Sequence, residues 1–314
     1  MNPLSAIYGG VVEARNALYD RRWSRSRPLQ GPVISVGNLS AGGSGKTPFV
    51  ILLGELLKAR GIRFDVLSRG YGRGTRGMLV VDPGGLPRDF GDEPLLIARR
   101  LQAPVVVGED RYEAGRFAES RFGPQIHLLD DGFQHRALAR DFDIVLVTPD
   151  DARDRLLPSG RLREPLRSLQ RADAVVLASG ASPESFPLAG KTVWRVRRGI
   201  VTQNVPPRPV VFCGIARPQN FLLQLRAAGI DPIAEAFFRD HHGYTEKDVR
   251  DLLQLQQRSE AGGFVTTEKD AVNLGGYLAA LAPLAVVPVK MELADAANAV
   301  DTMLRVIEDR RRRS

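Results

Sequence analysis

The sequence predicts an α/β protein: a parallel sheet core with helices on both faces, a smaller C-terminal α/β domain and an N-terminal amphipathic helix. Three observations support this prediction. From residue 32 to about residue 178, short β-rich runs alternate with helical stretches, as they do around parallel sheets. A glycine-rich loop separates the first strand from the helix that follows it. A polar stretch with three prolines (Pro206, Pro207 and Pro209) then interrupts the pattern.

The N-terminal segment, residues 1–28, is expected to be the amphipathic helix. Its apolar stripe consists of Leu4, Ile7, Tyr8, Val11, Val12, Leu18 and Tyr19, with Glu13, Asn16 and Asp20 opposite. Arg15 falls inside the stripe, and Arg21, Arg22, Arg25 and Arg27 follow it. Such a helix packs on its own domain or lies in a membrane interface, with arginines reaching the headgroups. The pattern alone leaves both open and favours packing on the domain.

Residues 29–200 are expected to form the larger α/β domain. Its strand candidates are Val33–Val36, Arg63–Leu67, Met78–Val81, Val105–Val107, Ile126–Leu129, Ile144–Val147 and Ala174–Leu177. The proline-bearing stretch from Gly199 to Pro209 marks the boundary.

Residues 205–314 are expected to form the smaller domain. Its elements are a strand at Val210–Cys213, helices near Pro218–Ala228 and Glu246–Gln257, and strands at Phe264–Thr266 and Ala285–Val289. The arginine run at 310–313 is typical of a solvated helix end.

Charge and cysteine content narrow the classes of protein. The 314 residues carry a net charge of +8, which favours anionic partners. Cys213 is the single cysteine, so an intrachain disulfide and a cysteine-built metal cluster are excluded, which fits a reducing compartment. No secretory signal pattern opens the chain, and no apolar run reaches the roughly 18 residues of a membrane span. We therefore expect no transmembrane segment.

The strongest motif lies between the first strand and the first helix. A phosphate-binding loop needs glycines that let backbone N–H groups surround the phosphates, a lysine for the β- and γ-phosphates and a hydroxyl for Mg²⁺. The loop consists of Ser40, Ala41, Gly42, Gly43, Ser44, Gly45, Lys46 and Thr47, with Ser40 where the general pattern has glycine. The following helix N-terminus adds partial positive charge. This predicts binding of ATP or GTP.

A magnesium site is expected beside this loop. Asp130 and Asp131 follow an apolar strand, and a carboxylate at such a strand end holds Mg²⁺ together with the hydroxyl of the phosphate loop, here Thr47. The pattern does not distinguish between the two aspartates.

Several short segments, in this order, resemble one enzyme family. They are Val36–Pro48, Ser68-Arg-Gly-Tyr-Gly72, Gly91-Asp-Glu-Pro94, Asp130-Asp-Gly-Phe-Gln-His135, Leu157–Pro165, Asp240-His-His242 and Val265-Thr-Thr-Glu-Lys-Asp270. The set closely resembles the tetraacyldisaccharide 4′-kinases, the lipid A 4′-kinases of Gram-negative bacteria. The resemblance extends from the N-terminal helix to about Leu274.

The resemblance implies a kinase with a P-loop NTPase-like core. It would use ATP and Mg²⁺ to phosphorylate the 4′-hydroxyl of a tetraacyldisaccharide 1-phosphate in lipid A biosynthesis. The family works peripherally at the cytoplasmic face of the bacterial inner membrane, so the resemblance now favours membrane docking of the N-terminal helix. It implies a lipid substrate and a membrane surface as partners, and no obligate protein partner is evident.

Phosphoryl transfer needs positioning, charge neutralisation and an acceptor for the hydroxyl proton. Lys46 would neutralise phosphate charge. The resemblance implies Asp92 as the base, supported by one of two adjacent histidines, and we select His241 over His242. Since the substrate carries a phosphate, cationic and polar residues should line its path. The candidates for substrate binding are Arg69, Tyr71, Arg111, Gln134, His135, Arg163 and Glu164.

Two other classes of protein share part of this pattern. A P-loop ATPase or GTPase acting as a switch or metal chaperone would share the phosphate loop. Such a protein needs a cysteine- or histidine-rich metal site or a guanine-reading Asn-Lys-x-Asp motif, and the sequence shows neither. A nucleic-acid binder is supported only by the net charge and the arginine tail. No nucleic-acid partner is therefore expected.

Overall fold

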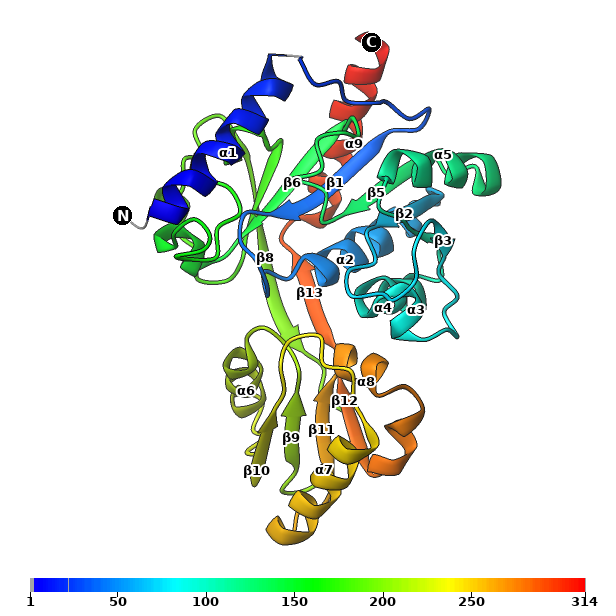
Figure 1. Ribbon diagram of the computed structural model, residues 1–314, viewed down its shortest axis with the longest axis vertical. Helices are drawn as coiled ribbons and strands as arrows, with labels where there is room; N and C mark the ends of the chain where they lie inside the picture. The colour runs from blue at the N-terminus through cyan, green and yellow to red at the C-terminus, as the bar shows by residue number, and fades with distance from the viewer. Residues whose placement is uncertain (1–2, 22, 314) are drawn as a thin grey trace.

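The structure is a computed structural model that describes residues 3–21 and 23–313. Two α/β units lie along the long axis of the molecule, and two antiparallel strands, β8 (Thr192–Ile200) and β13 (Val289–Leu293), extend between them (Figure 1). Arg22, one of the arginines expected to follow the first helix, lies outside the described residues.

The larger unit is built on a nine-stranded sheet. Its order is β13-β8-β7-β6-β1-β5-β2-β4-β3, with the strand that precedes the phosphate loop at its centre. Pairing is parallel except at the two edges, where β3 and β13 run antiparallel to their neighbours. The remaining strands are β1 (Val33–Asn38), β2 (Phe64–Ser68), β3 (Leu79–Val80), β4 (Val105–Val107), β5 (Ile126–Asp130), β6 (Phe142–Val147) and β7 (Ala174–Leu177).

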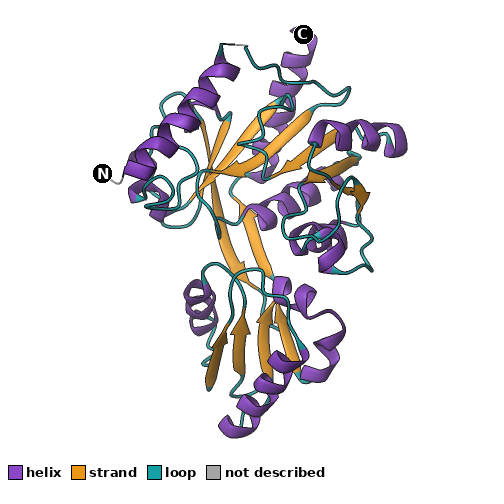
Figure 2. Cartoon of the chain, in the orientation of Figure 1, coloured by secondary structure: helices purple, strands orange, loops and turns teal. Residues whose placement is uncertain are grey.

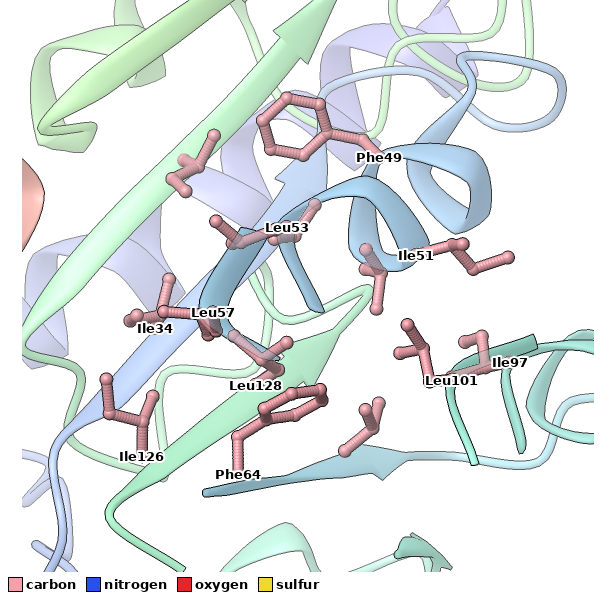
Figure 3. Close-up of a cluster of buried hydrophobic side chains, with 14 of the residues drawn as sticks. Ile34, Phe49, Ile51, Leu53, Leu57, Phe64, Ile97, Leu101, Ile126 and Leu128 are labelled. Carbon is pink, nitrogen blue, oxygen red and sulfur yellow. The ribbon is translucent and has the colours of Figure 1, made fainter. Parts of the chain in front are cut away.

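Helices cover both faces of this sheet, as expected for an α/β core (Figure 2). Successive strand residues point to opposite faces, so Ile34 packs under one helical layer and Val33 under the other. The first layer contains α2 (Lys46–Lys58), α4 (Asp92–Leu101) and α9 (Ala296–Arg313). Figure 3 shows Phe49, Leu53 and Leu57 of α2 inside this core.

The opposite face is covered by α5 (Arg111–Phe122) and by irregular segments between residues 133 and 188. Asp110 caps α5 by accepting hydrogen bonds from the amides of Tyr112 and Glu113. The short helices of this unit are α3 (Pro87–Phe90), η1 (Pro149–Arg153), η2 (Leu166–Arg171) and η3 (Pro183–Ser185).

The smaller unit contains a four-stranded parallel sheet of order β10-β9-β11-β12. Its strands are β9 (Val210–Cys213), β10 (Ala234–Phe237), β11 (Phe264–Thr267) and β12 (Leu284–Val287). Helix α6 (Pro218–Ala227) packs on one face, and α7 (Glu246–Ser259) packs on the other with α8 (Glu268–Leu274) and η4 (Gly275–Leu281). Thr245 and Asp248 form a capping box that starts α7.

The C-terminal segment differs from the sequence-based expectation. The sequence pattern places residues 205–314 in the smaller unit and predicts a single strand at Ala285–Val289. The structure instead has two strands, with Pro288 between them, and β13 pairs antiparallel with β8 in the larger sheet. Helix α9 then buries Val300, Met303 and Ile307 in the core of the larger unit. The chain therefore crosses between the units twice.

The first helix, α1 (Pro3–Asp20), lies along the outside of the larger unit (Figure 1). It is buried through small residues: Ser5 donates to the carbonyl oxygen of Leu156, and Gly9 lies against the same leucine. Part of the apolar stripe faces outward, because Ile7 and Val11 are 65% and 63% exposed. The other part, with Tyr8, Val12 and Tyr19, is half-buried, and the Tyr8 hydroxyl donates to the carbonyl oxygen of Arg163 at 3.1 Å. The stripe therefore packs on the domain only in part. None of the described helices is both long and apolar enough to span a bilayer.

Candidate active site

The glycine-rich loop lies where the sequence predicts it, between the end of β1 and the start of α2. Gly42, Gly43 and Gly45 adopt φ values of 76°, 63° and 85°, which a side chain would strain. Successive amides in such conformations form an anion-binding concavity at the helix N-terminus. The smaller unit reaches this loop through Arg217, whose side chain would lie 3.1 Å from a Cβ at Gly43.

Two oxygen atoms hold the side-chain nitrogen of Lys46 in place. Its Nζ lies 3.1 Å from Oδ1 of Asn38 and 3.5 Å from Oδ1 of Asp131. Asn38, the last residue of β1, also donates to Ser44 Oγ at 2.7 Å and to the carbonyl oxygen of Ser40 at 2.6 Å. The asparagine therefore orients the phosphate loop and its lysine together.

Asp130 lies at the end of β5, level with Val36 on the neighbouring parallel strand β1. Its Oδ2 accepts a hydrogen bond from Ser68 Oγ at 3.0 Å, while the buried Oδ1 has no partner. Burial and the charges of Glu93 and Asp131 raise the pKa of Asp130 to about 7. A cation is therefore the group that this carboxylate lacks.

Asp131, the next residue, is already paired. It adopts a φ of 50°, and both its oxygens accept from the guanidinium of Arg163, at 2.8 and 2.9 Å. Burial acts to raise the pKa of Asp131, but Lys46 and Arg163 outweigh it and hold the pKa far below its usual range. The two aspartates thus have opposite electrostatic environments.

These residues fit a magnesium ion. Mg²⁺ takes oxygen ligands, and in nucleotide sites it binds one or two protein groups plus phosphates and waters. Asp130 offers an unpartnered carboxylate oxygen, and Thr47 is buried in the first turn of α2. Among the residues the structure describes, no cluster of three or more His, Cys, Asp or Glu side chains could hold a metal without such additional ligands.

Asp92 lies at the start of α4 and is almost fully buried. Gly91 precedes it with a φ of 90°, and a Cβ there would approach the Tyr71 carbonyl oxygen to 2.9 Å, so glycine is required. The Asp92 carboxylate meets Nδ1 of His241 at 2.9 and 3.0 Å and accepts from Asn273 Nδ2 at 3.1 Å. Both of these side chains come from the smaller unit.

Electrostatics in this pair favour an ionised carboxylate. Burial acts to raise the pKa of Asp92, but the hydrogen bond with His241 and the charge of Lys269 lower it overall. Burial acts to lower the pKa of His241, but its bond with Asp92 outweighs burial and raises it. His241 also adopts a φ of 57°, which is uncommon for residues other than glycine.

The adjacent histidine has a different environment. Nε2 of His242 lies 3.1 Å from Asp248 Oδ2, and its ring stacks on Phe238 at 4.7 Å between centroids. Both partners belong to the smaller unit. The structure thus brings His241, and not His242, to Asp92.

The candidate substrate-binding cations form one group near the phosphate loop. Arg111, at the start of α5, is buried, and its Nε has no partner. Burial and the charge of Arg69 lower the pKa of Arg111. Burial, Arg111 and Arg140 lower the pKa of His135 to about 4, so this ring is neutral at pH 7. Nearby Asp110, Asp130 and Asp131 act to raise the pKa of Arg111 but do not outweigh burial and Arg69, and this excess of positive charge suits an anionic ligand.

The other candidates have mixed roles. Gln134 donates to the Asn38 carbonyl oxygen at 3.0 Å, and the ring of Tyr71, 65% exposed, lies 5.4 Å from that of His241. Glu164 is already paired, because Arg171 donates to it at 2.9 and 3.1 Å and Asn16 of α1 at 2.7 Å. This glutamate ties α1 to the larger unit and leaves little capacity for a ligand.

Four residues of the site were not selected from the sequence: Asn38, Arg217, Lys269 and Asn273. Asn38 and Lys269 lie inside segments that carry the family resemblance, but nothing in those segments marks one polar residue over another. Arg217 and Asn273 become visible only when the two units are placed together.

Comparison with known proteins identifies the family. The profile described as tetraacyldisaccharide-1-P 4′-kinase matches residues 1–308. A tetraacyldisaccharide 4′-kinase of Koribacter versatilis is 52% identical, with 99% of each chain covered. Another, from Aquifex aeolicus, is 39% identical over 88% of this chain and 89% of the relative. The crystal structure of the Aquifex aeolicus LpxK in complex with ATP superposes with a TM-score of 0.80 at 35% identity, covering 97% of this chain and 98% of that one.

Proposed function

The chain belongs to the tetraacyldisaccharide-1-phosphate 4′-kinase family, and we propose that it transfers the γ-phosphate of ATP to the 4′-hydroxyl of a tetraacyldisaccharide 1-phosphate. One observation supports this most: the Asp92–His241 pair lies close to the phosphate-binding site, because the charge of Glu93, next to Asp92, raises the pKa of Asp130, and the second unit supplies the histidine. A nucleotide switch has no need of an acid–base pair beside its phosphate loop. An alcohol kinase does, because a hydroxyl proton must be accepted.

In this proposal the phosphate loop binds the nucleotide. Amides of residues 42–46 surround the β- and γ-phosphates, and the ammonium group of Lys46 stabilises the negative charge that develops on them. Asp130 and Thr47 would hold Mg²⁺, which supplies neutralisation of phosphate charge. Asp131 holds Lys46 and Arg163 in place, as its ion pairs with both indicate.

Asp92 is proposed as the general base. Its lowered pKa keeps it ionised at neutral pH, and it accepts the proton of the 4′-hydroxyl as the oxygen attacks the γ-phosphorus. His241 orients the carboxylate and stabilises its charge through Nδ1. Nothing in this arrangement requires a covalent phosphoenzyme.

The acceptor would enter beside α1. Arg69 and Arg111 would bind the phosphate of the substrate, with His135, Gln134, Tyr71 and Arg163 lining its path. Glu164 would act indirectly by holding Asn16 and Arg171. Arg15 of α1 donates to the Gln134 carbonyl oxygen, so the first helix borders this path.

We further propose that α1 docks on the cytoplasmic face of the inner membrane, where a lipid with four acyl chains resides. The outward stripe of Leu4, Ile7 and Val11 would enter the interface, while the small face of the helix stays on the protein. Arg25, which follows the helix and is exposed, could reach lipid phosphates. Docking there would place the polar headgroup at the site while its acyl chains remain in the bilayer.

A transfer assay in detergent micelles tests the proposal. It uses γ-labelled ATP, Mg²⁺ and tetraacyldisaccharide 1-phosphate with the wild-type chain, Lys46→Ala, Asp92→Ala and the control Lys247→Ala, which removes an exposed lysine of α7. We expect label on the lipid with wild type and control and its loss in the other two. Retained transfer in Asp92→Ala would move the base elsewhere. ATP hydrolysis without labelled lipid would favour a general P-loop ATPase instead.

A further inference from the structure

Lys269 occupies a position between the two units that the proposed mechanism does not use. It belongs to the first turn of α8, just after β11, and its side chain is only 16% exposed. Its Nζ lies 3.1 Å from both Asp240 Oδ1 and His241 Nε2. The same nitrogen lies 3.7 Å from carboxylate oxygens of Asp92 and Glu93 on α4.

The contact with His241 fixes the direction of hydrogen bonding. A lysine ammonium only donates, so Nε2 of the ring must accept. In the neutral ring the proton then resides on Nδ1, which donates to Asp92. A chain of donation thus runs from Lys269 through the imidazole to the carboxylate. Without the lysine, the opposite tautomer would turn an unprotonated Nδ1 toward the Asp92 oxygens.

The charges around Lys269 come from three elements. Helix α4 presents Asp92 and Glu93, the loop before α7 presents Asp240 and His241, and α8 presents the neutral Asn273. Within residues 3–21 and 23–313, no other lysine or arginine forms an ion pair with any of these three carboxylates. The next residue toward the N-terminus, Glu268, is paired with Arg100.

Lys269 remains charged in this environment. Burial acts to lower its pKa, but Asp92, Glu93 and Asp240 outweigh burial and raise it. Its positive charge lowers the pKa of Asp92 and, at His241, opposes the larger effect of Asp92. Removing the charge would therefore make both groups hold protons more tightly.

We propose that Lys269 is a positioning residue for phosphoryl transfer, which holds His241 in the tautomer that donates to Asp92 and keeps that carboxylate ready to accept a proton. The inference rests on the proposed role of Asp92 as the base. During transfer the 4′-oxygen bonds to the γ-phosphorus, the bond to the β-phosphate oxygen breaks, and the hydroxyl proton passes to Asp92. Lys269 gains and loses no proton in this step. Because it lies on the smaller unit, it acts only when the two units are together.

The pH dependence of kcat/KM in the micelle assay provides the first test. Asp92 must be ionised, so activity falls as the pH drops through its pKa. In Lys269→Met this acid limb should move up by about one pH unit or more, because a cation within ~4–6 Å lowers a carboxyl pKa by that amount. Lys269→Arg should leave the limb near its wild-type position, and Lys247→Met serves as the exposed-lysine control. A uniform loss of rate at every pH in Lys269→Met would overturn the proposal.

Histidine tautomers give a second test that needs no catalysis. In ¹⁵N-histidine NMR spectra of the full chain, with His241→Gln used to assign the signal, wild type should show Nδ1 protonated and Nε2 unprotonated. Lys269→Met should lose this state. Lys269→Leu, which also has no hydrogen-bond donor, replaces it if methionine prevents folding, and it should also shift the acid limb. An unchanged His241 signal in a folded variant would overturn the proposal even if transfer to the lipid were never detected, which separates it from failure of the proposed function.

Discussion

Asp92 and His241 lie 149 residues apart in the sequence and on different units of the fold, yet Nδ1 of the histidine is 2.9 Å from Oδ2 of the aspartate. The contact depends on the smaller unit lying against α4. An arrangement that separated the units would leave Asp92 without His241, Lys269 and Asn273 at the same time. The acid–base pair is therefore complete only in the assembled molecule.

Replacing Asp92 by asparagine should strongly reduce the rate of transfer while leaving nucleotide binding intact. The amide keeps the shape and one acceptor oxygen but cannot take the hydroxyl proton, and general-base catalysis accounts for roughly 10²–10⁴-fold in rate. We expect kcat to fall about 1,000-fold and the KM for ATP to change less than about threefold. Asp89→Asn, on the short helix before α4, is the matched control. Activity near that of the control would remove Asp92 from the base role.

Substitutions of the two adjacent histidines should have different effects on kcat and on the thermal midpoint. His241→Ala removes the partner of Asp92 and should lower kcat about 100-fold. His242→Ala removes a ring stacked on Phe238 and bonded to Asp248, so it should lower the thermal midpoint with little effect on kcat in the folded protein. Measuring both properties for both variants checks this. The reverse pattern would exchange their roles.

The sequence predicts the local features and misses the long-range ones. The phosphate loop, the central strands and the pair Asp130 and Asp131 follow from patterns within a few residues, although these patterns do not choose between the two aspartates. The position of β13 in the larger sheet does not follow from such local patterns, because its pairing with β8 depends on residues about 95 positions away. The Asp92–His241 pair is predicted only through the family resemblance, and Lys269 is not predicted at all. A helical stripe such as that of α1 shows which residues share a face but not what covers it.

We expect Arg111 to strengthen substrate binding while its buried charge lowers the stability of the fold. Its guanidinium is buried without an ion-pair partner among the described residues, and its pKa is lowered, so the charged form is destabilised. We expect Arg111→Met to raise the KM for the lipid about tenfold through loss of a charge-assisted hydrogen bond. The thermal midpoint should stay level or rise. Arg116→Met, on the exposed side of α5, is the control. A lower midpoint with unchanged KM would assign Arg111 a structural role.

The outward stripe of α1 should govern membrane binding. The double variant Ile7→Ser and Val11→Ser removes apolar surface that is exposed in the structure, so stability should not change. Burying such side chains in an interface contributes on the order of 1–3 kcal/mol each, so we expect partition to anionic phospholipid vesicles to weaken at least about tenfold. Leu223→Ser, which is 62% exposed on α6, should bind like wild type. Equal binding by all three would place the docking surface elsewhere.

The buried pair of His127 and Asp65 should contribute to stability and not to catalysis. Both side chains are fully buried, with Nδ1 2.9 Å from Oδ1, at the N-terminal ends of β5 and β2, whereas the site lies at the opposite strand ends. His127→Ala would leave the carboxylate buried without a partner. Breaking such a pair costs about 3–5 kcal/mol, so the free energy of unfolding should fall by that order.

The double variant Asp65→Leu and His127→Leu separates the contribution of the ion pair to stability from the contribution of burying these two side chains. Replacing both partners by apolar groups removes the unpaired charge, so it should be more stable than His127→Ala by at least about 1 kcal/mol. Urea unfolding of the wild type and the two variants gives these differences, and kcat of each folded variant should stay near wild type. If the double variant is instead the less stable one, the ion pair itself stabilises the sheet beyond the packing that leucines provide, and the fold depends on this charged contact at the ends of its strands.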